Sequence, residues 1–102
     1  MIYRMRTYTI IPARLEAFNA LFHTQLEPIF SHYGTRTVGR WQDLERSCVV
    51  AIFEYDDLEH YQRSDAAVRS DPGYLALMAR ANAEGALYSA FEDVLMSSTN
   101  AQ

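Results

Sequence analysis

The stretch that decides the predicted fold is residues 2–10, Ile-Tyr-Arg-Met-Arg-Thr-Tyr-Thr-Ile. Its β-branched and aromatic residues favour a strand. Side chains alternate across a strand, so Arg4, Arg6 and Tyr8 share one face, and the opposite face carries Tyr3, Met5, Thr7 and Thr9. A sheet backed by helices offers its other face to water or to a partner. We expect the arginine face to be this open one and to line a cavity.

A helical segment is predicted after Pro12. Apolar residues from Leu15 to Tyr33 recur at spacings of three and four, which is the pattern of an amphipathic helix. Pro28 removes a backbone donor, so we expect a kink or a restart there. Gly34 is a stop signal for the helix.

Two further strands are expected next, over residues 35–42 and 47–55, joined by the polar segment 43–46. The second of them carries apolar residues on both faces, as a central strand does. The acidic stretch 56–59 resembles a capping box and predicts a helix over 57–70. That helix is expected to bury Leu58, Tyr61, Ala66 and Val68.

Asp71-Pro72 predicts the start of another helix, with Asp as its N-cap and Pro in its first turn. We expect this helix to carry Leu75, Met78 and Ala79 and to end at Gly85. A last strand is predicted over residues 87–97, and the polar residues 98–102 are expected to fray.

The order of elements is that of the α+β, ferredoxin-like βαββαβ fold. We expect one domain over residues 1–97, with a four-stranded antiparallel sheet, its first and third strands central, and the helices on one face. The other face would be left bare and apolar, and such faces are normally covered by a partner. The sequence therefore predicts a homodimer in which two sheets form an α+β barrel.

Composition excludes several classes of function. The chain of 102 residues has a net charge of −4, which gives no electrostatic footprint for nucleic acid. No apolar run is long enough to span a membrane, and the N-terminus carries no secretory pattern, so we expect a cytoplasmic protein. The single cysteine, Cys48, cannot form an internal disulfide or supply a metal site. We expect no metal and no cofactor.

Landmarks along most of the chain resemble the NIPSNAP family. Residues 2–9 resemble the family's opening Tyr-Glu-x-Arg-x-Tyr strand, and Pro12 and Leu15 match the residues after it. Further matches, in order, are Leu26-Glu27-Pro28-Ile29, Gly34, Gly39-Arg40-Trp41, Val49-Val50, Tyr55-Asp56-Asp57-Leu58, Asp71-Pro72 and Val94-Leu95. The resemblance implies the fold of the dimeric α+β barrels, which include cofactor-free monooxygenases and some heme enzymes.

The chain departs from the family pattern at four positions. Arg4 stands where the family usually has Glu, and Tyr33 where it usually has His. Ala51 and Phe53 stand where it often has His and Trp. The missing imidazoles remove the groups to which an acid–base role would be transferred.

Candidate ligand-binding residues are Arg6, Tyr8, Trp41, Phe53 and Tyr55. Arg6 could hold an anionic oxygen beside the Tyr8 hydroxyl, or pair with a carboxylate such as Glu54 or Glu92, because a buried arginine needs a partner. Trp41 could stack on a planar ligand or take part in ordinary packing. Aromatic residues 53 and 55 suit either an apolar ligand or a plain interface.

Three functional hypotheses remain open. The chain could bind a small, partly apolar molecule in the dimeric barrel, as a monooxygenase-like or isomerase-like enzyme that needs no cofactor. It could be a non-catalytic dimeric interaction module with a solid interior. It could bind heme, if a histidine such as His60 faced the cavity. No catalytic residue is assigned.

Overall fold

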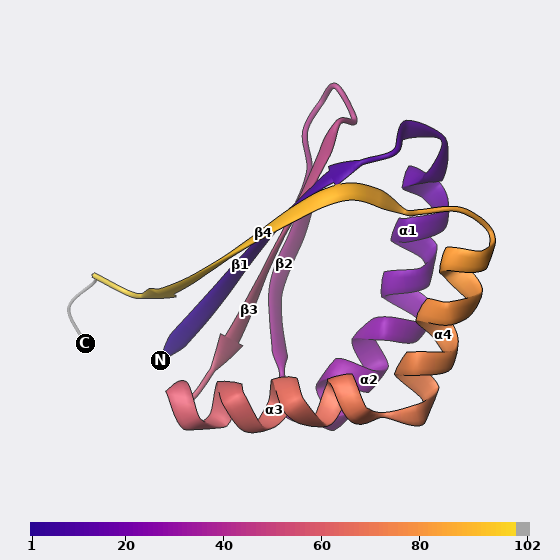
Figure 1. Cartoon of the computed structure of the whole chain (residues 1–102). Coiled ribbons are helices and arrows are strands. Elements are labelled where there is room, and N and C mark those ends of the chain that lie inside the picture. Colours follow the sequence, from indigo (N-terminus) through magenta and orange to yellow (C-terminus); the bar gives the residue numbers. More distant parts are fainter. Residues whose placement is uncertain (100–102) are drawn as a thin grey trace.

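The computed structural model describes residues 1–99, which form a four-stranded antiparallel sheet with helices on one face (Figure 1). The strands are β1 (Ile2–Ile10), β2 (Arg36–Gln42), β3 (Cys48–Tyr55) and β4 (Tyr88–Ser97), in the order β2-β3-β1-β4. The predicted ferredoxin-like fold, with the first and third strands central, is confirmed. Ser98 and Thr99 follow the last strand, and residues 100–102 of the predicted tail lie outside the described residues.

The first helical segment is broken into four parts: η1 (Pro12–Arg14), α1 (Leu15–Leu21), η2 (Phe22–Leu26) and α2 (Glu27–His32). The restart predicted at Pro28 is confirmed, since this proline lies in the first turn of α2. A π-helical turn, η2, precedes it and was not predicted. There the Thr24 hydroxyl donates to the Ala20 carbonyl at 2.6 Å, within the widened segment.

Gly34 ends this segment, as predicted. Its φ of +90° lies in the left-handed region that favours glycine. A Cβ at this position would lie 2.8 Å from His60 Nε2, so a larger residue would also collide with α3 (Leu58–Ser70). The turn therefore fixes the chain between α2 and β2.

The last two helices are α3 and α4 (Pro72–Ala83), both begun by an aspartate. Asp57 is the N-cap of α3 and accepts from the His60 amide at 2.7 Å, so the cap is one residue later than expected. Asp71 is the N-cap of α4, as predicted, and accepts from the Tyr74 amide at 2.8 Å.

The buried positions of these helices differ from the prediction. Helix α3 buries Ser64 and Val68, whereas Leu58 and Ala66 are exposed. Helix α4 buries Leu77 and Ala81. Leu75 and Ala79 are exposed and Met78 is only partly buried, so the face chosen for α4 was wrong. Both helices are short of apolar residues on a single stripe, and an ambiguous stripe does not fix the buried face.

The core lies between the sheet and the helices. On β3 every second residue is buried against the helices: Val49, Ala51, Phe53 and Tyr55. On the helical side the buried apolar residues are Leu15, Phe18, Phe22, Leu26, Leu77 and Ala81. The side chains of β3 and those of the helices therefore pack against each other between the sheet and the helical layer.

The arginine face of β1 points toward this core, which corrects the prediction that it is the open face. Arg4, Arg6 and Tyr8 pair across the sheet with Phe53, Ala51 and Val49, whose side chains face the helices. Residues directly opposite in adjacent strands lie on the same face of a sheet. The wall of any chamber between two sheets therefore does not include these arginines.

The open face carries the alternate residues. Among them are Met5 and Thr7 on β1, Val50 and Ile52 on β3, and Trp41 and Val94 on the outer strands. The Trp41 side chain is 53% exposed. Within residues 1–99, no helix is long and apolar enough to cross a membrane.

Candidate functional site

A pocket of about 240 Å³ lies between the sheet and helices α3 and α4. It is lined by three arginines, one aspartate, four aromatic residues and a valine: Arg4, Arg6, Arg69, Asp65, Phe30, Tyr74, Tyr88, Phe91 and Val68. The strands contribute two of the arginines and two of the rings, and the helices contribute the rest. Cationic groups and aromatic rings therefore meet in one pocket, which is partly open to solvent.

Arg4 is the most deeply buried charge in the pocket. Its side chain is 7% exposed, and its Nη1 donates to Asp65 Oδ1 at 3.3 Å. Its Cζ lies 5.3 Å from the centre of the Phe53 ring and 5.6 Å from that of Tyr61. Its Nε has no hydrogen-bond partner within residues 1–99. Leaving a buried donor unpaired costs about 1–3 kcal/mol. In the described part of the chain, the Nε of Arg14 and the Nη2 of Arg40 are buried without a partner in the same way.

Arg6 is held by a second aspartate. Its Nε and Nη2 donate to the two carboxylate oxygens of Asp93 at 2.7 and 2.8 Å. Burial, the largest single influence, acts to lower the pKa of Arg6, but Asp93 and Tyr8 together outweigh it and the pKa is raised. Burial is also the largest influence on Asp93 and acts to raise its pKa, but Arg6, together with Arg4 and Arg69, outweighs it and that pKa is lowered. Both groups are charged at neutral pH.

Aromatic rings surround the Arg6 guanidinium. Its Cζ lies 4.3 Å from the centre of the Phe91 ring and 5.7 Å from that of Tyr8. Tyr8 also packs against Tyr88 and Phe18, with ring centres 4.8 and 4.9 Å away. Burial raises the pKa of Tyr8, so its hydroxyl stays protonated and can act as a donor. The cluster can hold a planar group against a cation.

The structure brings together only part of the predicted site. Arg6 lines the pocket, and Tyr8 packs beside it without lining it. Phe53 and Tyr55 are core residues, with 1% and 0% of their surface exposed. Trp41 lies on the open face of the sheet, away from the others, because it pairs with Val50.

The predicted carboxylate partners of Arg6 were wrong. Glu54 and Glu92 lie opposite Tyr3 and Thr7, on the open face. Glu54 accepts instead from Tyr3 and Arg36. Asp93, directly opposite Arg6 on β4, is the partner. Glu92 and Asp93 are neighbours on β4 and therefore point to opposite faces of the sheet, so only Asp93 can reach Arg6.

Of the residues that line the pocket, only Arg6 was a predicted binding residue. Those missed by sequence reasoning include Arg4, Asp65, Arg69 and Phe91. Asp65 and Arg69 are four apart on α3 and form an ion pair at 3.0 Å, a spacing that is visible in the sequence. Their position over Arg4 is a tertiary feature. Phe91 lies on the same face of β4 as Asp93. The pairing of β4 with β1 places both residues beside Tyr8 and Arg6, and this pairing is not visible in the sequence.

No histidine lines the pocket between sheet and helices. His60 Nδ1 accepts from the Asp56 amide at 2.9 Å, and its other nitrogen lies against Gly34. The His60 imidazole therefore lies between the start of α3 and the turn that follows α2. Within residues 1–99 no group of three or more His, Cys, Asp and Glu residues is placed to hold a metal ion. The heme hypothesis has no ligand at the pocket.

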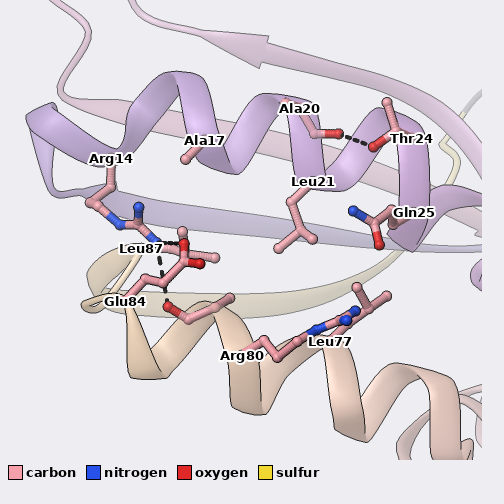
Figure 2. Close-up of a pocket in the computed structure, with 11 residues that line it drawn as sticks. Arg14, Ala17, Ala20, Leu21, Thr24, Gln25, Leu77, Arg80, Glu84 and Leu87 are labelled. Carbon is pink, nitrogen blue, oxygen red and sulfur yellow. Dashed lines mark hydrogen bonds and ion pairs between the residues drawn. The ribbon is translucent and has the colours of Figure 1, made fainter.

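A second cavity, of about 470 Å³, separates α1 and η2 from α4 (Figure 2). Leu21 points into it from α1, while Arg14 and Glu84 lie at one end (Figure 2). An Nη2 of Arg14 donates to the Ala81 carbonyl at 3.3 Å and lies 4.0 Å from Glu84. None of the predicted site residues lines this groove, so the pocket around Arg4 and Arg6 is the candidate site.

Comparison with known proteins gives the family. The NIPSNAP family model matches residues 3–99. An uncharacterized NIPSNAP domain protein from Burkholderia xenovorans is similar in structure, with a TM-score of 0.83, 24% identity, and 97% of this chain and 95% of that chain covered. A NIPSNAP family protein from Agrobacterium tumefaciens has a TM-score of 0.82 and 18% identity, over 97% and 93% of the two chains.

A more distant similarity is to an antibiotic biosynthesis monooxygenase, with a TM-score of 0.68 and 16% identity. It covers 98% of this chain and all of that one, and at this identity it shows a shared fold alone. No curated protein matches the sequence. The family model covers nearly the whole described chain, and the chain belongs to the NIPSNAP family.

Proposed function

We propose that the chain binds a small anion with a planar, apolar body in the pocket between its sheet and its helices. The observation that carries this proposal is Arg4, which lines the pocket with only 7% of its side chain exposed and is held there by one long contact, 3.3 Å, to Asp65. Ligand sites combine apolar surfaces with a few placed polar groups. Rings and arginines line this pocket together, and its exposed surface is more polar than apolar. The volume is below that of drug-sized sites, so the ligand is small.

Catalysis is the second step of the proposal. An arginine beside an enol or phenol would stabilise its anion, which an isomerase or a monooxygenase without a cofactor requires. The distant similarity in fold to an antibiotic biosynthesis monooxygenase supports this class. The nearby carboxylates, Asp65 and Asp93, are both held by arginines and are poor bases. Binding is therefore better supported than any reaction.

Calorimetric titration with naphthoate tests the binding proposal. We expect Arg4→Leu to weaken binding by about tenfold or more, since a charge-assisted hydrogen bond contributes about 1.5–3 kcal/mol. The matched control is Arg36→Leu, which removes an arginine paired with Glu54 on the open face. Equal affinities for wild type and Arg4→Leu, or no binding by wild type, would refute the proposal.

We also propose that a second copy of the chain covers the open face, so that the protein is a homodimer. The supporting observation is the apolar character of this face, where Trp41 and Val94 are 53% and 45% exposed. Met5, Val50 and Ile52 lie between them on the central strands. An exposed apolar sheet face of this kind is normally an interface. This would also be the surface used if the protein were an interaction module.

Sedimentation velocity at micromolar concentration measures the oligomeric state directly. A species of twice the chain mass is expected, and it should persist on dilution through the micromolar range. A monomer throughout that range would contradict the homodimer and leave the pocket proposal standing, because every residue lining the pocket comes from one chain.

A further inference from the structure

The charges around the pocket do not balance. Three guanidiniums line it, those of Arg4, Arg6 and Arg69, and two carboxylates pair with them, Asp65 and Asp93. One positive charge is left over, in a protein whose net charge is −4. The other acids of β4 and β3 near this level, Glu92 and Glu54, point to the opposite face and do not compensate it. Arg4, with 7% of its side chain exposed, shares Asp65 with Arg69, so its charge is only partly compensated. A partly compensated buried charge is costly and attracts a counter-charge.

The two carboxylates are held differently. Asp93 makes two short hydrogen bonds to Arg6, in the bidentate geometry that is strongest for this pair. Asp65 is shared: its Oδ1 lies 3.3 Å from Arg4 and its Oδ2 lies 3.0 Å from Arg69. The contact with Arg4 is the longest of these. A competing anion can therefore replace Asp65 at Arg4 while Asp65 keeps its bond to Arg69.

The aromatic lining gives the shape of the ligand. Phe91 lies against the Arg6 guanidinium, and Phe30, Tyr74 and Tyr88 add their rings to the wall beside the charged groups. Flat rings pack against rings and guanidinium planes, and a flexible chain gains less from such a wall. A volume of about 240 Å³ admits a compound of the size of naphthalene.

We infer that the ligand is a planar aromatic monoanion, such as a monocarboxylate, and that Asp65 sets this charge by giving up its contact with Arg4 and keeping its bond to Arg69 when the ligand binds. This rests on the proposed function and specifies it. A phosphate monoester carries close to two negative charges at neutral pH, one more than the pocket leaves unpaired. A neutral aromatic compound leaves the extra positive charge uncompensated.

Three probes that share a naphthalene ring test the charge rule: naphthoate, naphthalenedicarboxylate and naphthalenemethanol, titrated into the wild-type protein at neutral pH. We expect naphthoate to bind about tenfold more tightly than either of the others, which corresponds to about 1.4 kcal/mol. Binding of all three with similar affinity would overturn this inference and leave the proposed function intact. Binding of none would overturn both.

The Asp65→Asn variant tests the role of Asp65. It removes one negative charge, so two positive charges are left over and the ratio of dicarboxylate to naphthoate affinity should rise about tenfold. The matched control is Glu59→Gln on the same helix, which removes an exposed pair with Arg63 and should leave the ratio unchanged. An unchanged ratio in Asp65→Asn would overturn the inference.

A second variant keeps the test valid if Asp65→Asn does not fold. Arg69→Gln removes the leftover positive charge from the exposed end of the pair, where the Arg69 side chain is 65% exposed. We expect its preference for naphthoate over naphthalenemethanol to fall by about tenfold. A preference equal to that of the wild type would show that the charge count does not select the ligand, and it would overturn the inference.

Discussion

The two faces of the sheet come from the same strands but differ in charge and in exposure to solvent. The covered face of β1 carries Arg4 and Arg6, each paired with an aspartate and enclosed by rings. The open face of β1 carries Met5 and Thr7, with Trp41 exposed nearby. The face that carries the two arginines is covered by the helices, and the more apolar face is left uncovered by residues 1–99. The difference teaches that charge in a strand is not a guide to exposure when acids elsewhere in the fold can pair with it.

The physical reason is the cost of leaving a charge unpaired. Asp65 is 61 residues from Arg4 in the sequence, and Asp93 is 87 residues from Arg6. Asp65 pairs with the buried Arg4 and Asp93 pairs with Arg6, and these ion pairs offset the cost of taking the charges out of water. On the open face the Arg36–Glu54 ion pair stays partly exposed to water, and the apolar groups gain by meeting another apolar surface.

The largest expected effect is on the covered face. Phe53→Ala removes a ring that is 1% exposed and that packs on Phe30 and Phe22, with ring centres 5.6 and 6.2 Å away. We expect the free energy of unfolding in urea to fall by about 3–5 kcal/mol. The control, Leu44→Ala, changes a fully exposed side chain in the hairpin. A loss from Phe53→Ala as small as that of the control would contradict the assignment of the core.

The next effect is on the open face. Ile52→Glu places a carboxylate at the centre of the proposed dimer contact, opposite Met5. Burying an unpaired charge there should raise the dissociation constant of the dimer by about tenfold or more, measured by sedimentation equilibrium. Leu44→Glu adds the same charge at an exposed position and should leave it unchanged. An intact Ile52→Glu dimer would place the interface elsewhere.

A smaller effect is expected from acid. The pKa of Asp93 is lowered from its ordinary 3.8, with Arg6 as the favourable partner. A carboxyl of this kind contributes stability that is present above its unfolded pKa and is lost as the pH falls through its folded pKa. Between about pH 5 and about pH 3, wild type should therefore lose more unfolding free energy than Asp93→Asn. Parallel losses in the two proteins would contradict this ion pair.

The smallest effect belongs to the exposed ion pair between Arg36 and Glu54 on the open face. Their contact is short, at 2.8 Å, but the Arg36 side chain is 43% exposed. Arg36→Gln should change the free energy of unfolding by less than about 1 kcal/mol, measured in urea beside wild type. A larger loss would mean that the partner copy buries this pair.

Much of the fold could be predicted from the sequence because its signals are local. The bounds of β1, the cap at Asp71 and the stop at Gly34 depend on neighbours a few residues away. The π-helical turn at 22–26 could not, since it depends on how the segment packs over the sheet. On α3 the predicted burial of Val68 is confirmed and Tyr61 packs against the core, whereas Leu58 and Ala66 are exposed. The buried face of α4 was misjudged because neither helix has a clear apolar stripe.

The candidate site could be predicted only in part. Alternation along β1 correctly groups Arg4, Arg6 and Tyr8, but a period of two does not say which side the helices cover. Trp41 was assigned to the same site although it points to the other side of the sheet. Asp65, Arg69 and Phe91 come from elements whose position over β1 is a property of the tertiary fold.

The central claim is that the ligand sits on the covered face, against the two arginines. Nuclear magnetic resonance during a naphthoate titration tests it most directly, through the side-chain Nε–H signals of Arg4 and Arg6 and the indole N–H of Trp41. The account predicts saturating shifts of the two arginine signals while the Trp41 signal stays in place. Shifts confined to Trp41 and its neighbours on the open face would contradict it.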